Sequence, residues 1–174
     1  GVTATSYLVD DNQPLPQIVA ASTEGATTTY THGHDLISQT QSGTGTHFYV
    51  YDGQLSTRQL TTAAGTTSDT YDYDAFGVLL ASSGTTQNEF LYGGEQFDAN
   101  ARFYYLRARY YDPSTGRFLG TDPAAGDISD PVSLHRYLYA GANPMTYGDP
   151  SGRNIALLVG AVGVILAFLW TFDT

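Results

Sequence analysis

The sequence predicts a mainly β protein, a strip of short strands joined by tight turns and followed by one apolar C-terminal α-helix. Three observations lead to this fold class. The 174 residues include 14 tyrosines and 19 glycines, whereas glycine ordinarily makes up about 7% of a chain. Tyrosine and threonine favour strands, and glycine and aspartate favour the turns between them. The helix is expected from an uncharged apolar run over residues 155–170.

A tyrosine followed by a turn recurs through the first two thirds of the chain. Successive copies lie 18 to 22 residues apart, which leaves room for two strands of roughly 5 to 6 residues and their turns. Such units bury their aromatic faces only by stacking on neighbours. Nothing before Tyr7 resembles a cap, so we expect the first strand to present an uncovered edge. The recurring tyrosines are Tyr30, Tyr51, Tyr73, Tyr92 and Tyr110.

Local patterns support individual strands and turns. The aromatic and β-branched run at residues 48–51 ends in Asp52-Gly53, a dipeptide that favours a two-residue type I′ hairpin turn. Aromatic and acidic side chains alternate over residues 70–74, which places the rings on one face of a strand and the carboxylates on the other. The threonine-rich segments 23–31 and 61–70 fit either strands with exposed hydroxyl groups or loops.

The charged residues exclude some classes of function. The formal net charge is −10, all seven basic residues are arginines, and they form no basic run. A chain of this charge repels phosphate backbones, so we expect no nucleic-acid partner. Four arginines lie close together in the sequence, and we expect structural ion pairs with carboxylates rather than a binding patch. These are Arg102, Arg107, Arg109 and Arg117.

Neither a metal nor a cofactor is expected. The chain has no cysteine, which removes disulfides and thiolate metal sites. His32 and His34 are two residues apart beside Asp35, but a metal requires further ligands. No phosphate-binding glycine loop or hydrolase elbow occurs. The chain begins at Gly1 without a signal-peptide pattern, so we expect a processed piece or an incomplete sequence.

The apolar run forms a separate segment. As a helix, residues 155–170 would span about 24 Å, less than the roughly 30 Å hydrocarbon core of a bilayer. Ala156, Gly160, Gly163 and Ala167 would form a stripe of small residues that lets two helices approach closely. Three alternatives are open: packing into the chain's own β-domain, self-association with like helices, and a membrane anchor. We favour self-association.

Residues 102–152 resemble the C-terminal core of the Rhs/YD-repeat family. The resemblance is carried by Tyr105-Leu-Arg-Ala-Arg-Tyr-Tyr-Asp-Pro-Ser-Thr-Gly-Arg-Phe118, then Asp122-Pro123, Arg136-Tyr137, Asn143-Pro144 and Asp149-Pro-Ser-Gly152. The upstream tyrosine units resemble ordinary YD repeats, so the resemblance extends over about residues 5–153. It implies a β-sheet strip that spirals into a hollow shell, with the core motif as a plug at one end.

The resemblance also implies a site for self-cleavage. Several bacterial members of the family cleave themselves after a motif similar to Asp149-Pro-Ser-Gly followed by leucine, by aspartyl-protease chemistry. The matching candidates are Asp122 and Asp149, with Arg117 nearby and Asp130 as a substitute. Here Arg153 stands in place of the leucine, so we expect self-cleavage to be absent or very slow.

These observations lead to three predicted regions and two functional hypotheses. The regions are a YD-repeat β-strip over residues 1–101, the core motif over 102–153, and the apolar tail over 154–174. The first hypothesis is an extracellular or cell-surface wall protein that assembles with itself into filaments or tubes, or anchors in a membrane, through residues 155–170. The alternative is the C-terminal plug of a toxin-delivery shell with aspartyl self-cleavage.

Overall fold

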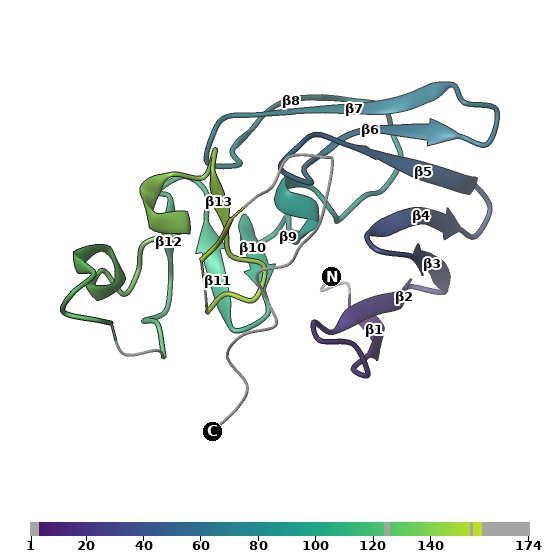
Figure 1. The fold of residues 1–174 in the computed structure, drawn as a ribbon. Coiled ribbons are helices and arrows are strands. Elements are labelled where there is room, and N and C mark those ends of the chain that lie inside the picture. The colour runs from purple at the N-terminus through teal and green to yellow at the C-terminus, as the bar shows by residue number, and fades with distance from the viewer. Residues whose placement is uncertain (1–3, 124–125, 154, 158–174) are drawn as a thin grey trace. The chain divides into compact units, whose positions relative to one another are not determined.

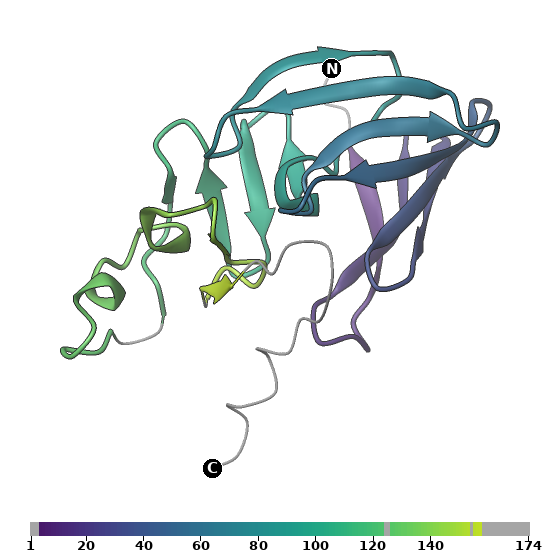
Figure 2. The same cartoon turned by 45° about the horizontal axis from the view of Figure 1, so that its top comes forward.

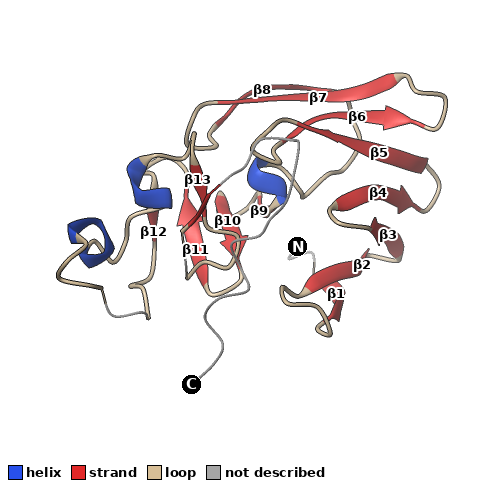
Figure 3. Ribbon diagram, in the orientation of Figure 1, coloured by secondary structure: helices blue, strands red, loops and turns tan. Residues whose placement is uncertain are grey.

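A computed structural model describes residues 4–123, 126–153 and 155–157 of the chain. Strands dominate these residues, and their helical segments are short 3₁₀ helices (Figure 3). The predicted mainly β class is therefore confirmed. The first eight strands are β1 (Thr5–Asp10), β2 (Gln17–Thr23), β3 (Ala26–His32), β4 (Leu36–Gln41), β5 (Gly45–Tyr51), β6 (Thr57–Thr62), β7 (Thr67–Tyr73) and β8 (Leu79–Ser83).

These eight strands form one sheet in chain order, from β1 to β8 (Figure 1). Neighbouring strands from β1 to β5 pair in antiparallel register, as do β6 and β7. Threonine hydroxyls meet across the strands, with Oγ1 distances of 2.7 Å between Thr5 and Thr23 and 2.9 Å between Thr40 and Thr46. Both threonine-rich segments therefore contribute to strands, as the first of their two interpretations predicted.

The described residues divide into two compact units that interleave along the chain. The first holds residues 4–50, 58–70 and 83–86, and the second holds 51–57, 71–82, 87–123, 126–153 and 155–157. In the first unit, Tyr30, Leu36, Tyr49 and Leu60 are buried. Tyr49 Oη donates to Oε1 of the buried Gln39 at 2.7 Å. The boundaries predicted near residues 101 and 153 stay a prediction.

Two turns that follow Tyr-Asp pairs have the same hydrogen bonds. In the first, the Asp52 carboxylate accepts from the backbone N–H groups two and four residues later, and Leu55 N–H donates to the Asp52 carbonyl. The Asp74 carboxylate and carbonyl make the same three contacts 22 residues later. Positive φ occurs at Leu55 (62°) rather than at Gly53. The predicted type I′ turn at Asp52-Gly53 is therefore wrong, because the Asp52 side chain organises a longer turn.

The second unit contains a small sheet in the order β12-β11-β10-β9, together with the pair β13-β14. Figure 2 shows β10 and β11 side by side in this unit. The remaining elements are η1 (Tyr92–Gly94), β9 (Gln96–Asp98), β10 (Phe103–Leu106), β11 (Arg109–Asp112), β12 (Arg117–Phe118), η2 (Pro131–Leu134), η3 (Ala140–Ala142), β13 (Tyr147–Gly148) and β14 (Ala156–Leu157).

Buried tyrosines form the core of the second unit. The rings of Tyr111 and Tyr139 stack with centroids 4.0 Å apart, and Tyr104 lies beside Tyr111. Three tyrosine hydroxyls donate to successive backbone carbonyls of the Asp74 turn, which fixes this turn against the small sheet. The pairs are Tyr92 with Ala75 at 2.8 Å, Tyr111 with Phe76 at 2.7 Å and Tyr104 with Gly77 at 3.0 Å.

The C-terminal helix predicted over residues 155–170 is not present where the structure describes this segment. Ala156 and Leu157 form β14 and pair with Tyr147 and Gly148 of β13. Ala156 is therefore not part of a helical stripe, because its backbone continues the β13 ladder. The other predicted stripe residues, Gly160, Gly163 and Ala167, lie outside the described residues. Across the described part of the chain, no helix has the length and apolar character needed to cross a membrane.

Candidate active site

A turn at Asp149–Arg153 lies against the hairpin that joins β10 and β11. Ala108 N–H in that hairpin donates to the Ser151 carbonyl at 3.3 Å. The turn resembles those after Tyr51 and Tyr73: Gly152 N–H donates to the Asp149 carbonyl at 3.1 Å, and Arg153 N–H donates to Asp149 Oδ1 at 3.0 Å. Asp149 thus makes two of the three contacts that Asp52 and Asp74 make in their turns, and it also accepts from Ser151 Oγ at 3.1 Å.

Arg109 joins the two predicted aspartates. Its Nη2 atom lies 2.9 Å from Asp122 Oδ2 and 3.1 Å from Asp149 Oδ2. The side chains of Arg109 and Asp149 are 4% and 2% exposed. Phe118 covers the guanidinium, whose central carbon lies 3.6 Å from the ring centroid. Nη1 donates to the Arg136 carbonyl at 3.1 Å, so neighbouring backbone also fixes the orientation of the guanidinium.

The same arginine contacts the peptide group between Gly152 and Arg153. Arg109 Nε donates to the Gly152 carbonyl oxygen at 2.5 Å. The amide nitrogen of that peptide bond donates to Asp149 Oδ1. A cation therefore lies at the oxygen of this peptide group, and a carboxylate lies at its nitrogen. The Asp74 turn differs in this respect: Asp149 pairs with Arg109, whereas Asp74 forms no ion pair among the described residues.

Gly152 permits this close approach. Its φ is +67°, which favours glycine, and a Cβ atom at this position would lie 2.1 Å from the Leu106 carbonyl oxygen. The same atom would lie 3.0 Å from the Arg109 amide nitrogen. A larger residue at position 152 would therefore push the turn away from the hairpin and from Arg109.

A second arginine and a third carboxyl group hold the other side of the turn. Arg107 Nη1 lies 2.7 Å from Glu95 Oε2 and also donates to the Pro150 carbonyl. The Glu95 side chain is 12% exposed. The pKa of Glu95 is raised to about 7, chiefly by burial; Arg107 opposes the shift, and the nearby Asp149 carboxylate adds to it.

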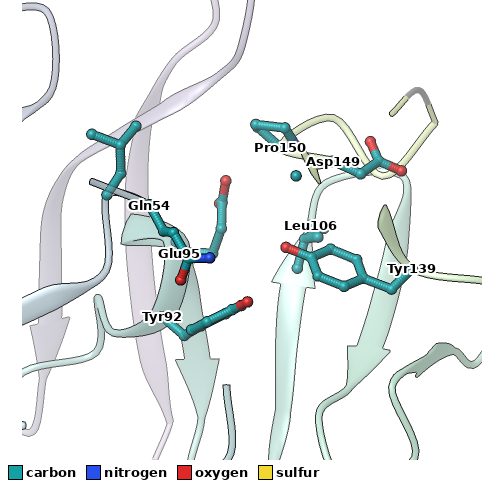
Figure 4. Close-up of a pocket in the computed structure, with 10 residues that line it drawn as sticks. Gln54, Tyr92, Glu95, Leu106, Tyr139, Asp149 and Pro150 are labelled. Carbon is teal, nitrogen blue, oxygen red and sulfur yellow. The ribbon is translucent and has the colours of Figure 1, made fainter. Parts of the chain in front are cut away.

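Glu95 and Asp149 line the same small cavity. Its volume is about 30 Å³, room for one or two water molecules. Figure 4 shows Gln54, Tyr92 and Glu95 on one side of the cavity and Leu106, Tyr139, Asp149 and Pro150 on the other. All these residues belong to the second unit. The arrangement provides two carboxyl groups and space for water beside the Asp149 turn.

The structure brings together some of the predicted site residues and leaves others apart. Asp122 and Asp149 meet at Arg109. Arg117 does not join them, because residues alternate between faces in β12, so Phe118 faces inward while Arg117 is exposed. Asp130 is exposed and caps η2 by accepting from Val132 N–H at 3.2 Å.

Sequence reasoning did not assign Arg109 or Glu95 to the site. Arg109 could have been found from the alternation in β11, because Arg109 and Tyr111 lie on the same face of the strand and both are buried. The predicted structural ion pairs do form, between Arg107 and Glu95 and between Arg109 and both Asp122 and Asp149. Glu95 gave no local signal, because its role depends on contacts with residues distant in sequence.

The histidines do not form a metal site with other residues in the part of the chain that the structure describes. His32 Nε2 lies 2.8 Å from the Ile18 carbonyl, and His34 Nδ1 lies 3.3 Å from Asp35 Oδ2 at the surface. No group of three or more potential metal-binding side chains occurs among residues 4–123, 126–153 and 155–157.

Comparisons with known proteins identify relatives of greater length. No family model matches the chain. It is 33% identical over 162 residues to the tRNA3(Ser)-specific nuclease WapA of Bacillus spizizenii. This alignment covers 90% of the present chain and 7% of the nuclease. The chain is also 38% identical over 84 residues to toxin subunit YenC1 of Yersinia entomophaga. That alignment covers 47% of the present chain and 8% of the toxin subunit.

A solved structure shows the same fold. The crystal structure of TcdB2-TccC3-Cdc42 matches with a TM-score of 0.66 and 22% sequence identity, over 87% of this chain and 8% of that chain. The present chain thus corresponds to less than a tenth of each of these relatives. The activities in their names belong to those much longer proteins.

Proposed function

We propose that this chain is a segment of an Rhs/YD-repeat protein, the closing end of a toxin-delivery shell, and that it hydrolyses its own Gly152–Arg153 peptide bond. The observation that carries this proposal is Arg109, which contacts both aspartates and the carbonyl oxygen of that bond. The similarity to a toxin subunit and to a nuclease favours this hypothesis over a wall protein. An extracellular or cell-surface location is part of the proposal.

The geometry supports a hydrolysis in which the two aspartates that meet at Arg109 carry out the proton transfers. One carboxylate takes a proton from water, whose oxygen attacks the Gly152 carbonyl carbon. The Arg109 Nε–H group stabilises the negative charge that develops on the carbonyl oxygen. Asp149, beside the Arg153 nitrogen, gives that nitrogen the proton taken from water as the C–N bond breaks. The products are a carboxylate at Gly152 and an amine at Arg153.

The arginine at position 153 fits this site. Its side chain is exposed, and its contact with Asp149 is made by the backbone N–H group. Leucine would present the same N–H group, so replacing leucine with arginine removes none of the contacts described above. The expectation of slow or absent cleavage, which rested on this departure, therefore loses its main physical reason.

Intact-mass spectrometry of the purified chain over time tests the proposal. We expect a fragment that ends at Gly152 to accumulate in the wild type and to be absent from Asp122→Asn and Asp149→Asn. Asp130→Asn and Arg117→Ala are matched controls, because both residues are exposed and lie outside the Arg109 contacts; they should cleave like the wild type. A folded wild-type chain that stays intact at every pH tested would contradict the proposal.

A further inference from the structure

Two carboxyl groups line the small cavity beside the Asp149 turn, those of Glu95 and Asp149. Arg109 pairs with Asp149, whereas Arg107 pairs with Glu95. If both carboxyl groups are ionised, two negative charges lie at one small cavity and repel each other. One proton on either carboxyl group removes this repulsion.

Glu95 is the carboxyl group best placed to carry that proton. It interacts with one guanidinium, while Asp149 also accepts from Arg153 N–H and Ser151 Oγ. Arg107, Asp149, Tyr92 and Tyr139 face Glu95 from the β10–β11 hairpin, the loop after β13, η1 and the start of η3. Burial raises the pKa of Tyr139, which is therefore neutral across the acidic and neutral range.

Glu95 acts on the peptide bond through another residue. Its Oε2 holds Arg107 Nη1, and that same nitrogen donates to the Pro150 carbonyl. Pro150 follows Asp149 directly, so Arg107 fixes the beginning of the turn while Arg109 fixes its end at Gly152. Together the two arginines set the position of the Gly152–Arg153 bond relative to the aspartates.

We propose that Glu95 is a positioning residue whose protonated form, through Arg107, keeps the Asp149–Arg153 turn seated on the β10–β11 hairpin. Loss of its proton places an ionised carboxylate beside Asp149 in a small cavity, away from bulk water. Lifting the turn then hydrates Glu95 and separates the two carboxylates, so ionisation favours the open turn. This inference rests on the proposed self-cleavage for its catalytic meaning, but the movement of the turn can be tested independently.

Hydrogen exchange measured between pH 5.5 and 8.5 tests the movement. Peptides that span residues 149–153 come only from uncleaved chains, so cleavage does not affect this measurement. After correction for intrinsic exchange, wild-type protection should fall by about tenfold as the pH rises through 7. Glu95→Gln should keep the high protection at every pH, and the control Glu89→Gln should follow the wild type. A Glu95→Gln variant with the wild-type pH dependence would overturn the inference.

A second variant keeps the inference testable if Glu95→Gln does not fold. Arg107→Gln removes the guanidinium through which Glu95 holds the turn, so protection of residues 149–153 should be low at every pH. An Arg107→Gln variant with the wild-type pH dependence would also overturn the inference.

The rate of cleavage provides the link to catalysis. We expect wild-type cleavage to slow above pH 7, and we expect Glu95→Gln to cleave as fast at pH 8.5 as at pH 6. If no variant cleaves but the exchange results are as expected, the proposed function fails and the positioning role of Glu95 stands. If cleavage occurs with the same pH profile in both chains, the positioning role fails and the proposed function stands.

Discussion

At the scale of single residues, Arg109 links almost every feature of the site. One guanidinium contacts two carboxylates, two backbone carbonyls and the face of Phe118. Such a side chain has a structural and a chemical role, and the two are separated by measuring stability and cleavage on the same variants.

Replacing Arg109 should destabilise the protein strongly. Arg109→Ala leaves the buried Asp149 carboxylate without its cation, and breaking a buried pair in this way costs about 3–5 kcal/mol. Arg109→Lys restores the charge but not the planar fork that reaches Gly152 and both aspartates. Urea denaturation measures the loss, and Arg117→Ala, an exposed position, should change stability by about 0.5 kcal/mol or less. An Arg109→Ala variant as stable as the wild type would remove the structural role.

Glu95 should make global stability depend on pH. Its pKa is raised from 4.5 to about 7 in the folded protein, so its favourable contribution is complete below pH 4.5 and is lost as the pH rises through 7. The loss amounts to at most about 3 kcal/mol. Urea denaturation at a series of pH values should show this decline in the wild type but not in Glu95→Gln. Parallel pH profiles for the two chains would show that Glu95 does not titrate in this range.

At the scale of elements, the chain uses one kind of turn three times. Asp52, Asp74 and Asp149 each accept the N–H group four residues later, and each turn has positive φ at its fourth residue. The proposed site is therefore a repeat turn to which the neighbouring hairpin adds Arg109. We expect no cleavage in the Asp74 turn, because Asp74 forms no ion pair with an arginine among the described residues.

Gly152→Ala tests how closely that turn must approach the hairpin. A Cβ atom would collide with the Leu106 carbonyl oxygen, and alanine would also adopt a positive φ. We expect a loss of at least about 2 kcal/mol, together with loss of cleavage. Gly43→Ala is the matched control, since Gly43 has φ +89° and no atom within 4 Å of the added Cβ; only the backbone cost of about 1–2 kcal/mol is expected there. Equal losses in the two variants, measured by thermal denaturation, would show that close packing at Gly152 is unimportant.

The sequence predicted these elements to different degrees. Alternation and composition were sufficient for the strands, because their tyrosine and threonine side chains interact across neighbouring strands. The turn at Asp52 was predicted too short, since the reach of its carboxylate to Ser56 N–H is not evident from the Asp-Gly dipeptide. Asp122 and Asp149 were found through the resemblance. Arg109 and Glu95 needed the tertiary contacts that only the folded chain shows.

At the scale of the whole molecule, the apolar run over residues 155–170 follows directly on the proposed site. β14 is paired with β13, and Asp149 follows β13 directly. The backbone that leads into the apolar run is thus joined to the strand that carries the proposed site. Self-association and membrane binding through this run both stay predictions. Because Ala156 lies in β14, a helical stripe of small residues could include only Gly160, Gly163 and Ala167.

Removing residues 158–174 should separate assembly from folding, because it deletes most of the apolar run and leaves β14 in place. Each aliphatic side chain that becomes buried contributes roughly 1.5–3 kcal/mol, so an uncovered run of this length should drive association. We expect the full chain to form large particles in sedimentation velocity and the truncated chain to sediment as a small soluble species. Gly160→Leu should weaken assembly without unfolding the β-sheets, because a bulky residue prevents close helix contact.

Flotation of the full chain with lipid vesicles would identify a membrane instead of a like helix as the partner. A truncated chain that unfolds would show that the apolar run packs within its own β-domain, and both forms of association would then be wrong.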